Sequence, residues 1–351
     1  MANYTEIDDP SAYFQTTLYT GNGGADHAIT NAGNSDLQPD MVWIKNRDAA
    51  DSHVLVDSLR GVGKVLTPDT AAPQTDDADT VDAFQSDGFR VDADVKVNTN
   101  NEKYVAWQWK GGTTASGTTG GSGTGKPYAY SASPASGFSV VTFTGNATAG
   151  HLIPHGMGKV PKMIHVKSIA NDNGWTSGVS VAGGFNDHAY LYLANAFGTD
   201  ANQFGGTHTT TNIRLGTGTG TNENNVTRYA MCFADVPGYQ KIGEYVGNGN
   251  ADGTFINTGF SPAFLMIKQA AASNDWFMID NKREPFNPNN VQLVANGTGA
   301  STNKGDLDLL SNGFKPRSSN AAWNENNAVY IYLAIAENPF TTSTGIPATA
   351  R

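Results

Sequence analysis

The chain has 351 residues, which is enough for two or three domains with cores of their own. Only 15% of the residues are charged and 40 are glycine, a profile typical of turn-rich β proteins and unlike that of helical bundles or coiled coils. The net charge is -10 and Lys and Arg do not cluster, so we expect no nucleic-acid binding. The sequence has no apolar run of membrane-spanning length and no charged, apolar and small-residue leader, so we expect neither membrane insertion nor classical export.

Three similar stretches follow one another along the chain. Each contains a proline six residues before a lysine, with an apolar run between them: Pro39 to Lys45, Pro161 to Lys167 and Pro262 to Lys268. A Tyr/Phe-x-Gly-Asn turn precedes each stretch, and an aromatic-led apolar run beginning at Tyr104, Tyr229 or Tyr330 follows it. These tyrosines come 59, 62 and 62 residues after their lysines. A repeat of about 100 residues has the size of a domain, so the sequence predicts three copies of one module.

The repeat predicts the domain boundaries. The first module covers residues 1–112 and is followed by a tract rich in Gly, Thr and Ser at 113–136, which we expect to be a linker or an extended arm. The second module covers 137–237, the third follows directly at 238–340, and 341–351 form a C-terminal tail. The second and third modules should therefore be held rigidly together, while the first has more freedom.

Within each module the local signals are strands and turns. The apolar runs before the marker lysines are short and rich in β-forming residues, so they indicate buried strands. The run Tyr330–Ile335 is apolar on both alternating faces, which predicts a strand covered on each side. Asp79–Phe84 is the main helical candidate. We expect an all-β fold of three tandem homologous antiparallel β-sandwich modules, of jelly-roll or lectin type.

One position after each marker lysine is a candidate for ligand recognition. Eight residues beyond the lysines stand His53, Trp175 and Trp276, with Asp172 and Asp275 close to the two tryptophans in sequence. A ring stacks on the C–H face of a sugar while a nearby carboxylate binds hydroxyls, so these residues fit a glycan site. The alternative is that the rings pack in the core, as large aromatic side chains usually do, and we expect this for at least one tryptophan.

Two acid–arginine pairs also recur, Asp57 with Arg60 and Asp280 with Arg283. The second module lacks the pair, which favours a local salt bridge over catalysis.

Metal and catalytic patterns are weak throughout the sequence. The acidic stretch 76–82 lacks the spacing of an EF-hand loop, and His151 and His155 stand in a turn without a third ligand. The Gly-x-Ser-x-Gly-like run at Ser122 falls in the predicted linker. Cys232 is the only cysteine, so no disulfide forms within the chain, which fits folding in a reducing cytoplasm. We therefore expect no metal, no cofactor and no enzymatic activity.

Several segments resemble virion proteins of tailed bacteriophages from aquatic environments, especially those that infect cyanobacteria. They are Asp8–Gln15, Tyr19–Asn22, Asp36–Arg47, Asp57–Gly61, Gly238–Asn248, Phe260–Lys268 and Ala334–Phe340. The resemblance covers almost the whole chain, and some of the similar proteins are labelled tail fibre. It implies a location in the virion, assembled in the host cytoplasm, and supplies no catalytic or binding residues.

The resemblance leads to three functional hypotheses. The first is a non-enzymatic, tail-associated host-recognition protein with lectin-like modules. Its expected partners are other virion proteins, further copies of the chain and a host surface glycan. The second is a capsid decoration protein, and the third is a glycan-degrading hydrolase of tailspike type. A distal fibre fits less well, because the sequence has no heptad stalk and no collagen-like tract.

Overall fold

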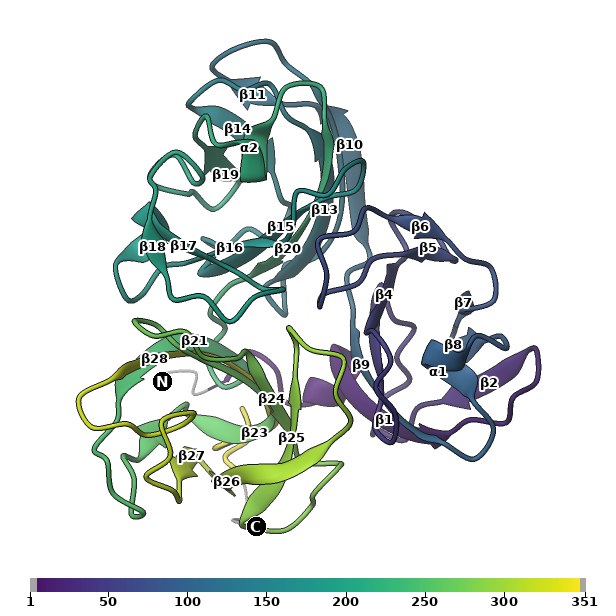
Figure 1. Cartoon of the computed structure of the whole chain (residues 1–351), viewed down its shortest axis with the longest axis vertical. Helices are drawn as coiled ribbons and strands as arrows, with labels where there is room; N and C mark the ends of the chain where they lie inside the picture. The colour runs from purple at the N-terminus through teal and green to yellow at the C-terminus, as the bar shows by residue number, and fades with distance from the viewer. Residues whose placement is uncertain (1–4, 348–351) are drawn as a thin grey trace.

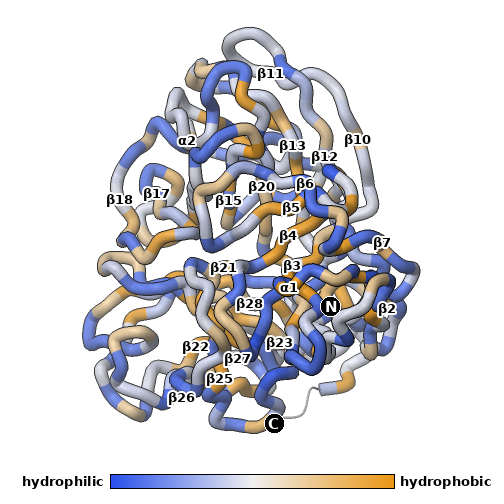
Figure 2. The backbone as a smooth tube through the Cα atoms, turned by 45° about the vertical axis from the view of Figure 1, so that its right-hand side comes forward, coloured by the Kyte–Doolittle hydropathy of each residue, from blue (hydrophilic) through white to orange (hydrophobic). Residues whose placement is uncertain are grey.

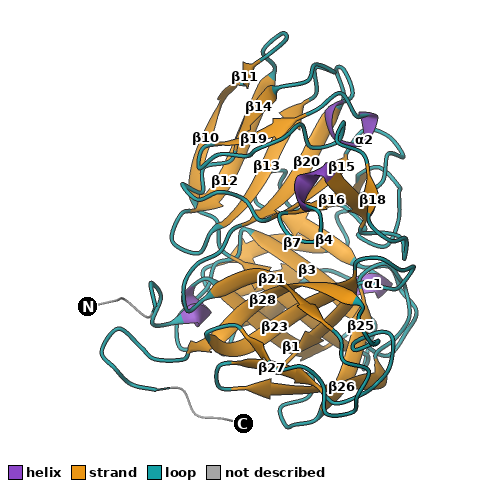
Figure 3. Ribbon diagram, turned by 90° about the vertical axis from the view of Figure 1, so that its left-hand side faces the viewer, coloured by secondary structure: helices purple, strands orange, loops and turns teal. Residues whose placement is uncertain are grey.

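The computed structural model describes residues 5–347 and consists almost entirely of β-strands (Figure 3). Its helical elements in this range are α1 (Val95–Asn98), α2 (Thr219–Asn222) and two short 3-10 turns, η1 (Pro10–Ala12) and η2 (Gly184–Asn186). Every strand pairing in the described range is antiparallel. The predicted all-β class is thus confirmed. The ends of the predicted terminal segments, residues 1–4 and 348–351, lie outside the described residues.

The first third of the chain, residues 5–112, contains a four-stranded sheet and smaller strands that cover it. The four strands pair in the order β1-β9-β3-β4, and β2, β8 and β7 form a three-stranded sheet. The strands are β1 (Phe14–Thr20), β2 (His27–Thr30), β3 (Met41–Asn46), β4 (Val54–Asp57), β5 (Lys64–Val65), β6 (Thr75–Asp76), β7 (Val81–Gln85), β8 (Gly88–Val91) and β9 (Lys103–Trp109).

The middle third, residues 113–237, contains an eight-stranded sheet in the order β10-β12-β13-β20-β15-β16-β17-β18, with β11, β14 and β19 in a second sheet. The strands are β10 (Thr113–Thr118), β11 (Gly120–Gly121), β12 (Pro127–Ser133), β13 (Phe138–Thr144), β14 (His151–Pro154), β15 (Met163–Ser168), β16 (Thr176–Val179), β17 (Asp187–Tyr190), β18 (Gly198–Thr199), β19 (Asn212–Leu215) and β20 (Thr227–Phe233).

The last third, residues 238–347, forms one eight-stranded sheet in the order β21-β28-β23-β24-β25-β26-β27-β22. Strands β26 and β27 contact β23, so the sheet curls back on itself toward a barrel. The strands are β21 (Gln240–Val246), β22 (Ile256–Asn257), β23 (Phe260–Gln269), β24 (Phe277–Asp280), β25 (Asn289–Val294), β26 (Thr302–Leu310), β27 (Gly313–Pro316) and β28 (Val329–Pro339).

Four strands follow one order in all three thirds: β1-β9-β3-β4, β13-β20-β15-β16 and β21-β28-β23-β24. The three apolar runs before the marker lysines are the strands β3, β15 and β23, as the sequence predicts. Strand β28 is central and its Tyr330–Ile335 stretch is buried, which confirms the expectation of a strand covered on both sides. The prediction of a helical turn at Asp79–Phe84 is wrong, because β7 begins at Val81 and pairs with β8.

The three thirds form three lobes around a common centre (Figure 1). One hydrophobic cluster at this centre takes buried side chains from every third, including Trp107, Phe233 and Phe264. Separate clusters fill the interiors of the first and middle lobes. In Figure 2 the backbone around β3 and β4 is coloured as hydrophobic, while many outer loops are hydrophilic. The first third is therefore packed into the same core as the others, contrary to the greater freedom expected for it.

The Gly/Thr/Ser-rich tract at 113–136, predicted as a linker or an extended arm, is an ordered part of the middle sheet. Thr113–Thr118 forms β10, which pairs with β12, and β12 pairs in turn with β13. Glycine and threonine contribute few apolar side chains to a core. An antiparallel strand pairing nevertheless gives their backbone N–H and C=O groups hydrogen-bond partners. The tract thus extends the sheet by two strands and does not act as a flexible spacer.

Candidate functional site

The three residues predicted as recognition candidates are all buried. His53, Trp175 and Trp276 each have 0% exposure. Asp172 is exposed, whereas Asp275 is half-buried and accepts a hydrogen bond from Asn296 Nδ2 at 2.8 Å. No ring face remains on which a sugar could stack. The structure therefore corrects the glycan interpretation of this position in favour of the packing alternative.

The two tryptophans connect neighbouring lobes. Trp175 Nε1 in the middle third donates to the carbonyl of Thr67 in the first third at 3.0 Å. Trp276 Nε1 in the last third donates to the carbonyl of Tyr190 in the middle third, also at 3.0 Å. An indole N–H that is buried needs such an acceptor, and here the acceptor comes from a different lobe.

His53 makes the corresponding contact between the first and last thirds. Its Nδ1 accepts from Trp43 Nε1 at 2.8 Å, because an indole nitrogen can only donate. The neutral ring therefore carries its proton on Nε2, which lies 3.1 Å from the carbonyl of Val294 and 3.2 Å from that of Gly297. Burial lowers the pKa of His53 to about 3. The ring thus stays neutral and acts as a donor, as the indoles of Trp175 and Trp276 do.

The three acceptor carbonyls occupy one and the same place in their sheets. Tyr190 pairs with Thr176 and Val294 pairs with Phe277, while Thr67 follows Leu66, which bridges to Leu55. In each third the acceptor therefore lies on the segment that pairs with β4, β16 or β24, the strand that comes next after the marker lysine. The contacts run from the middle to the first, from the last to the middle and from the first to the last third. They form a closed cycle.

The two acid–arginine pairs lie at the same junctions. Arg60 Nε contacts Asp57 Oδ2 at 2.6 Å, and Arg283 Nε contacts Asp280 Oδ2 at 2.6 Å, which confirms the predicted local salt bridges. All four side chains are almost fully buried. Arg60 covers the ring of Tyr229 in the middle third, as Arg283 covers that of Trp107 in the first third.

The marker lysines support loops. Lys268 Nζ donates to the carbonyls of Ala194, Ala272 and Asn274 at 2.9, 3.2 and 2.6 Å. Lys45 and Lys167 likewise donate to backbone carbonyls, namely that of the last residue of their own strand and those of the loop that follows it. Burial lowers the pKa of each of the three lysines to about 8. Their recurrence in the sequence reflects this structural role.

An asparagine that the sequence analysis missed holds the Gly-Asn turn of each third. The backbone N–H groups of Asn22, Asn146 and Asn248 each donate to a buried asparagine Oδ1 at 2.9 Å. The three acceptors are Asn98, Asn222 and Asn324. The constant separation of 76 residues within each pair is the signal that could have revealed them.

The turn glycine is required by close backbone contact. A Cβ at Gly21 would lie 2.1 Å from the carbonyl oxygen of Thr99, and one at Gly247 would lie 2.2 Å from that of Glu325. Any side chain would therefore push apart the turn and the segment that carries the asparagine.

The strand register corrects one alignment from the sequence. Lys45 pairs with Val105 and Lys167 pairs with Tyr229, so Tyr229 does not correspond to Tyr104. Arg228 occupies that place instead. The hydroxyls of Tyr104 and Tyr330 donate to the carbonyls of Val95 and Ala321, and Arg228 donates to that of Thr219. A guanidinium therefore replaces a phenol in fixing the same turn, which a motif based on aromatic residues could not reveal.

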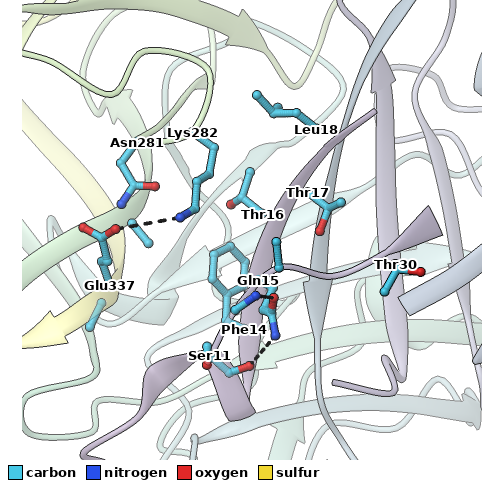
Figure 4. A pocket seen from close by; sticks show the side chains of 14 residues that line it. Ser11, Phe14, Gln15, Thr16, Thr17, Leu18, Thr30, Asn281, Lys282 and Glu337 are labelled. Carbon is cyan, nitrogen blue, oxygen red and sulfur yellow. Dashed lines mark hydrogen bonds and ion pairs between the residues drawn. The ribbon is translucent and has the colours of Figure 1, made fainter. Parts of the chain in front are cut away.

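A cavity of about 340 Å³ lies between the first and last thirds (Figure 4). Residues 14–18 of β1 form one wall, together with small residues such as Gly33. Ala263, Asn281, Lys282, Ala336 and Glu337 form the opposite wall. Lys282 Nζ lies 3.9 Å from Glu337 Oε1, so the two charges largely offset one another. Hydroxyl groups, backbone edges and small apolar side chains thus surround the space.

The described range has neither a side-chain cluster suited to a metal ion nor a helix suited to crossing a membrane. Residues 5–347 contain no group of three or more His, Cys, Asp or Glu side chains that could hold a metal ion. In the acidic stretch, Asp76 pairs with Lys64 and Asp82 with Arg90. No helix in this range is both long and apolar enough to cross a membrane.

No curated protein matches this sequence. A family model does match, and it spans residues 9–339 without interruption, which includes strands from all three lobes. The chain therefore belongs to the family described as Domain of unknown function (DUF7483).

Proposed function

We propose that the three thirds are copies of one β-sandwich module of jelly-roll type, arranged about an approximate threefold axis. The shared strand order supports this, and so do the equivalent donors and acceptors at the three junctions. The middle third carries two extra strands, β10 and β12, while the last third has a longer β25–β26 region. The unbroken family match is consistent with three modules that are inherited as one unit.

The protein so arranged is a non-enzymatic structural protein exposed on a phage virion. The cycle of buried junctions is the observation that carries the structural part of this proposal, because it joins three lobes into one body. The virion setting rests on the resemblance of segments such as Asp36–Arg47 and Gly238–Asn248 to phage proteins. A position associated with the tail is proposed first, with other virion proteins and further copies of the chain as partners.

Capsid decoration is the second candidate, and the threefold arrangement favours it. Subunits in symmetric assemblies meet at rotation axes, and a chain with three similar lobes can place equivalent surfaces around a threefold position of a shell. The tailspike-type hydrolase has no comparable support. The positions first considered for glycan contact, His53, Trp175 and Trp276, are interior, so host recognition would need other residues.

Electron-microscope images of phage particles that carry a tagged copy of this protein would test the proposal. Label at the tail in a few copies supports the first candidate. Label in many copies at lattice positions of the head supports the second. Particles of normal composition that contain none of the protein would refute both.

The non-enzymatic part is tested separately with the purified chain and host polysaccharide. The expected result is unchanged polymer length after prolonged incubation. Reproducible cleavage that a single carboxylate substitution abolishes would refute it.

A further inference from the structure

The cavity beside β1 lies along a free strand edge. β1 is the last strand of its sheet and pairs only with β9. The carbonyl of Tyr13 accepts from Lys110 N–H and the N–H of Gly21 donates to Glu102, so the odd-numbered residues of β1 face β9. The backbone groups of Phe14, Thr16 and Leu18 consequently point to the other side. Residues from both faces of β1 line the cavity, which places the cavity at this edge.

The same edge is covered in the other two thirds. In the middle third, β12 pairs along β13, with Ser133 opposite Phe138 and Ser131 opposite Val140. In the last third, the end of the middle third covers the edge of β21: Val236 and Gln240 exchange backbone hydrogen bonds at 2.9 and 3.0 Å, and Asp235 accepts from Ile242 N–H. The first third is thus the one of the three in which no neighbouring segment of the described chain covers this edge.

The cavity corresponds in place to β12. Ser131 on β12 donates to Asp40 Oδ1 of the adjacent lobe at 2.9 Å. Asp40 stands five residues before its marker lysine, and Ala263, which lines the cavity, stands five residues before Lys268. At the junction of the first and middle thirds, the position of Asp40 is in contact with β12. At the junction of the last and first thirds, the equivalent position, Ala263, faces the cavity instead.

Residues 5–13, the described segment before β1, line the space at Ser11 and do not fill it. Glu6 N–H donates to the carbonyl of Pro237, the last residue of the middle third, at 3.3 Å. The turn η1 contacts β28 of the last third, so the described N-terminal residues run along the junction of these two thirds. The Thr16 hydroxyl at the cavity is buried and has no hydrogen-bond partner in the range 5–347.

We propose that the free edge of β1 accepts an extended segment of a partner protein, which adds to the sheet as β12 does in the middle third. The backbone groups of Thr16 and Leu18 would pair with the incoming strand. Ala263 and Ala336 leave room for small apolar side chains on the incoming strand. At the equivalent position of the first third, Asp40 accepts a hydrogen bond from Ser131 of β12. This site depends on the β1 edge alone and not on the virion setting.

A peptide with the sequence of residues 128–133 serves as the probe, because this segment occupies the equivalent edge. Titration calorimetry should show saturable binding to the full chain, and the backbone amide resonances of Thr16 and Leu18 should shift. A peptide methylated on the backbone nitrogens of the residues equivalent to Ala129 and Ser131 should bind about tenfold more weakly, since it cannot donate to β1. Methylation at Tyr130, whose N–H faces away from β13, is the matched control.

The variant A263L should fill the cavity and abolish binding, and A271L, an exposed site beyond the other end of β23, should not. If A263L folds poorly, the shifts of the Thr16 and Leu18 amide resonances in the unaltered chain still show whether the peptide binds at β1. No binding, equal binding of all three peptides, or shifts confined to other strands would overturn the proposal. A dimer of the chain that A263L dissociates would also overturn it, because the occupant would then be a second copy.

Discussion

Trp276 Nε1 donates a hydrogen bond to the carbonyl of Tyr190 at 3.0 Å. The two residues are 86 positions apart in the sequence and belong to different lobes. The same relationship connects Trp175 with Thr67 and His53 with Val294. A position that varies between the three sequence repeats is therefore uniform in what it does. It donates one hydrogen bond across a junction.

Replacing Trp276 by Ala should lower the free energy of unfolding by about 3 to 5 kcal/mol, because a large buried side chain is removed from a packed core. W276F keeps most of the apolar volume and loses the donor, so a loss of about 1 to 3 kcal/mol is expected. Urea denaturation followed by circular dichroism measures both. F286A, at a side chain that is 75% exposed, is the control and should change stability by less than about 0.5 kcal/mol. Equal stabilities of W276A and F286A would contradict the burial described here.

Acid should destabilise the protein through His53. Between pH 6.5 and about 3 the unfolded chain binds a proton at this ring and the folded chain does not, so the free energy of unfolding falls as the pH falls. At pH 5.5 the contribution of His53 is a loss of about 1.4 kcal/mol. H53Q can accept from Trp43 and donate to Val294 without titrating, so its stability should fall less between pH 7.5 and 5.5. An identical fall in the two proteins would exclude this role.

The buried asparagine that holds each Gly-Asn turn should contribute more to the free energy of unfolding than an ordinary surface amide does. Asn324 Oδ1 accepts from the N–H of Asn248, and the two hydrogens of Asn324 Nδ2 are shared among three oxygen acceptors. N324A should therefore cost about 2 to 4 kcal/mol. Its neighbour Asn326 is exposed, and N326A should be close to neutral in the same denaturation experiment. A small effect of N324A would show that the turn holds without the amide.

The marker lysines should be chemically protected in the folded protein. Lys45, Lys167 and Lys268 are fully buried, whereas Lys103 is exposed. Brief treatment with an acetylating reagent, followed by peptide mass spectrometry, should modify Lys103 well before the three marker lysines. In urea the difference should disappear. Rapid acetylation of Lys268 under native conditions would be inconsistent with its three carbonyl contacts.

The strands were predictable from sequence because their signals are local. Proline, an apolar run and lysine identified β3, β15 and β23, and the same pattern gave the repeat. The short helix α1 and the strand β7 were missed or misassigned, since four or five residues carry little periodicity. The tract that forms β10 was interpreted as a linker or an extended arm, because backbone pairing with β12 leaves no trace in its side chains.

The candidate site could be predicted only in part. The sequence identified His53, Trp175 and Trp276 as equivalent, and left core packing and glycan contact as alternatives. Their acceptors belong to other lobes, 86 to 241 residues away, so no local pattern could decide between the two. The free edge of β1 was equally hidden, because an edge is defined by the strand that is absent beside it.

Hydrogen exchange in increasing denaturant tests most directly whether the three lobes form one body. If the junction contacts couple them, the amides of β9, β20 and β28 should lose protection together in one cooperative step, and W175A should lower that step for all three strands. Three separate steps, with W175A affecting only the strands of the first and middle thirds, would contradict the cyclic closure.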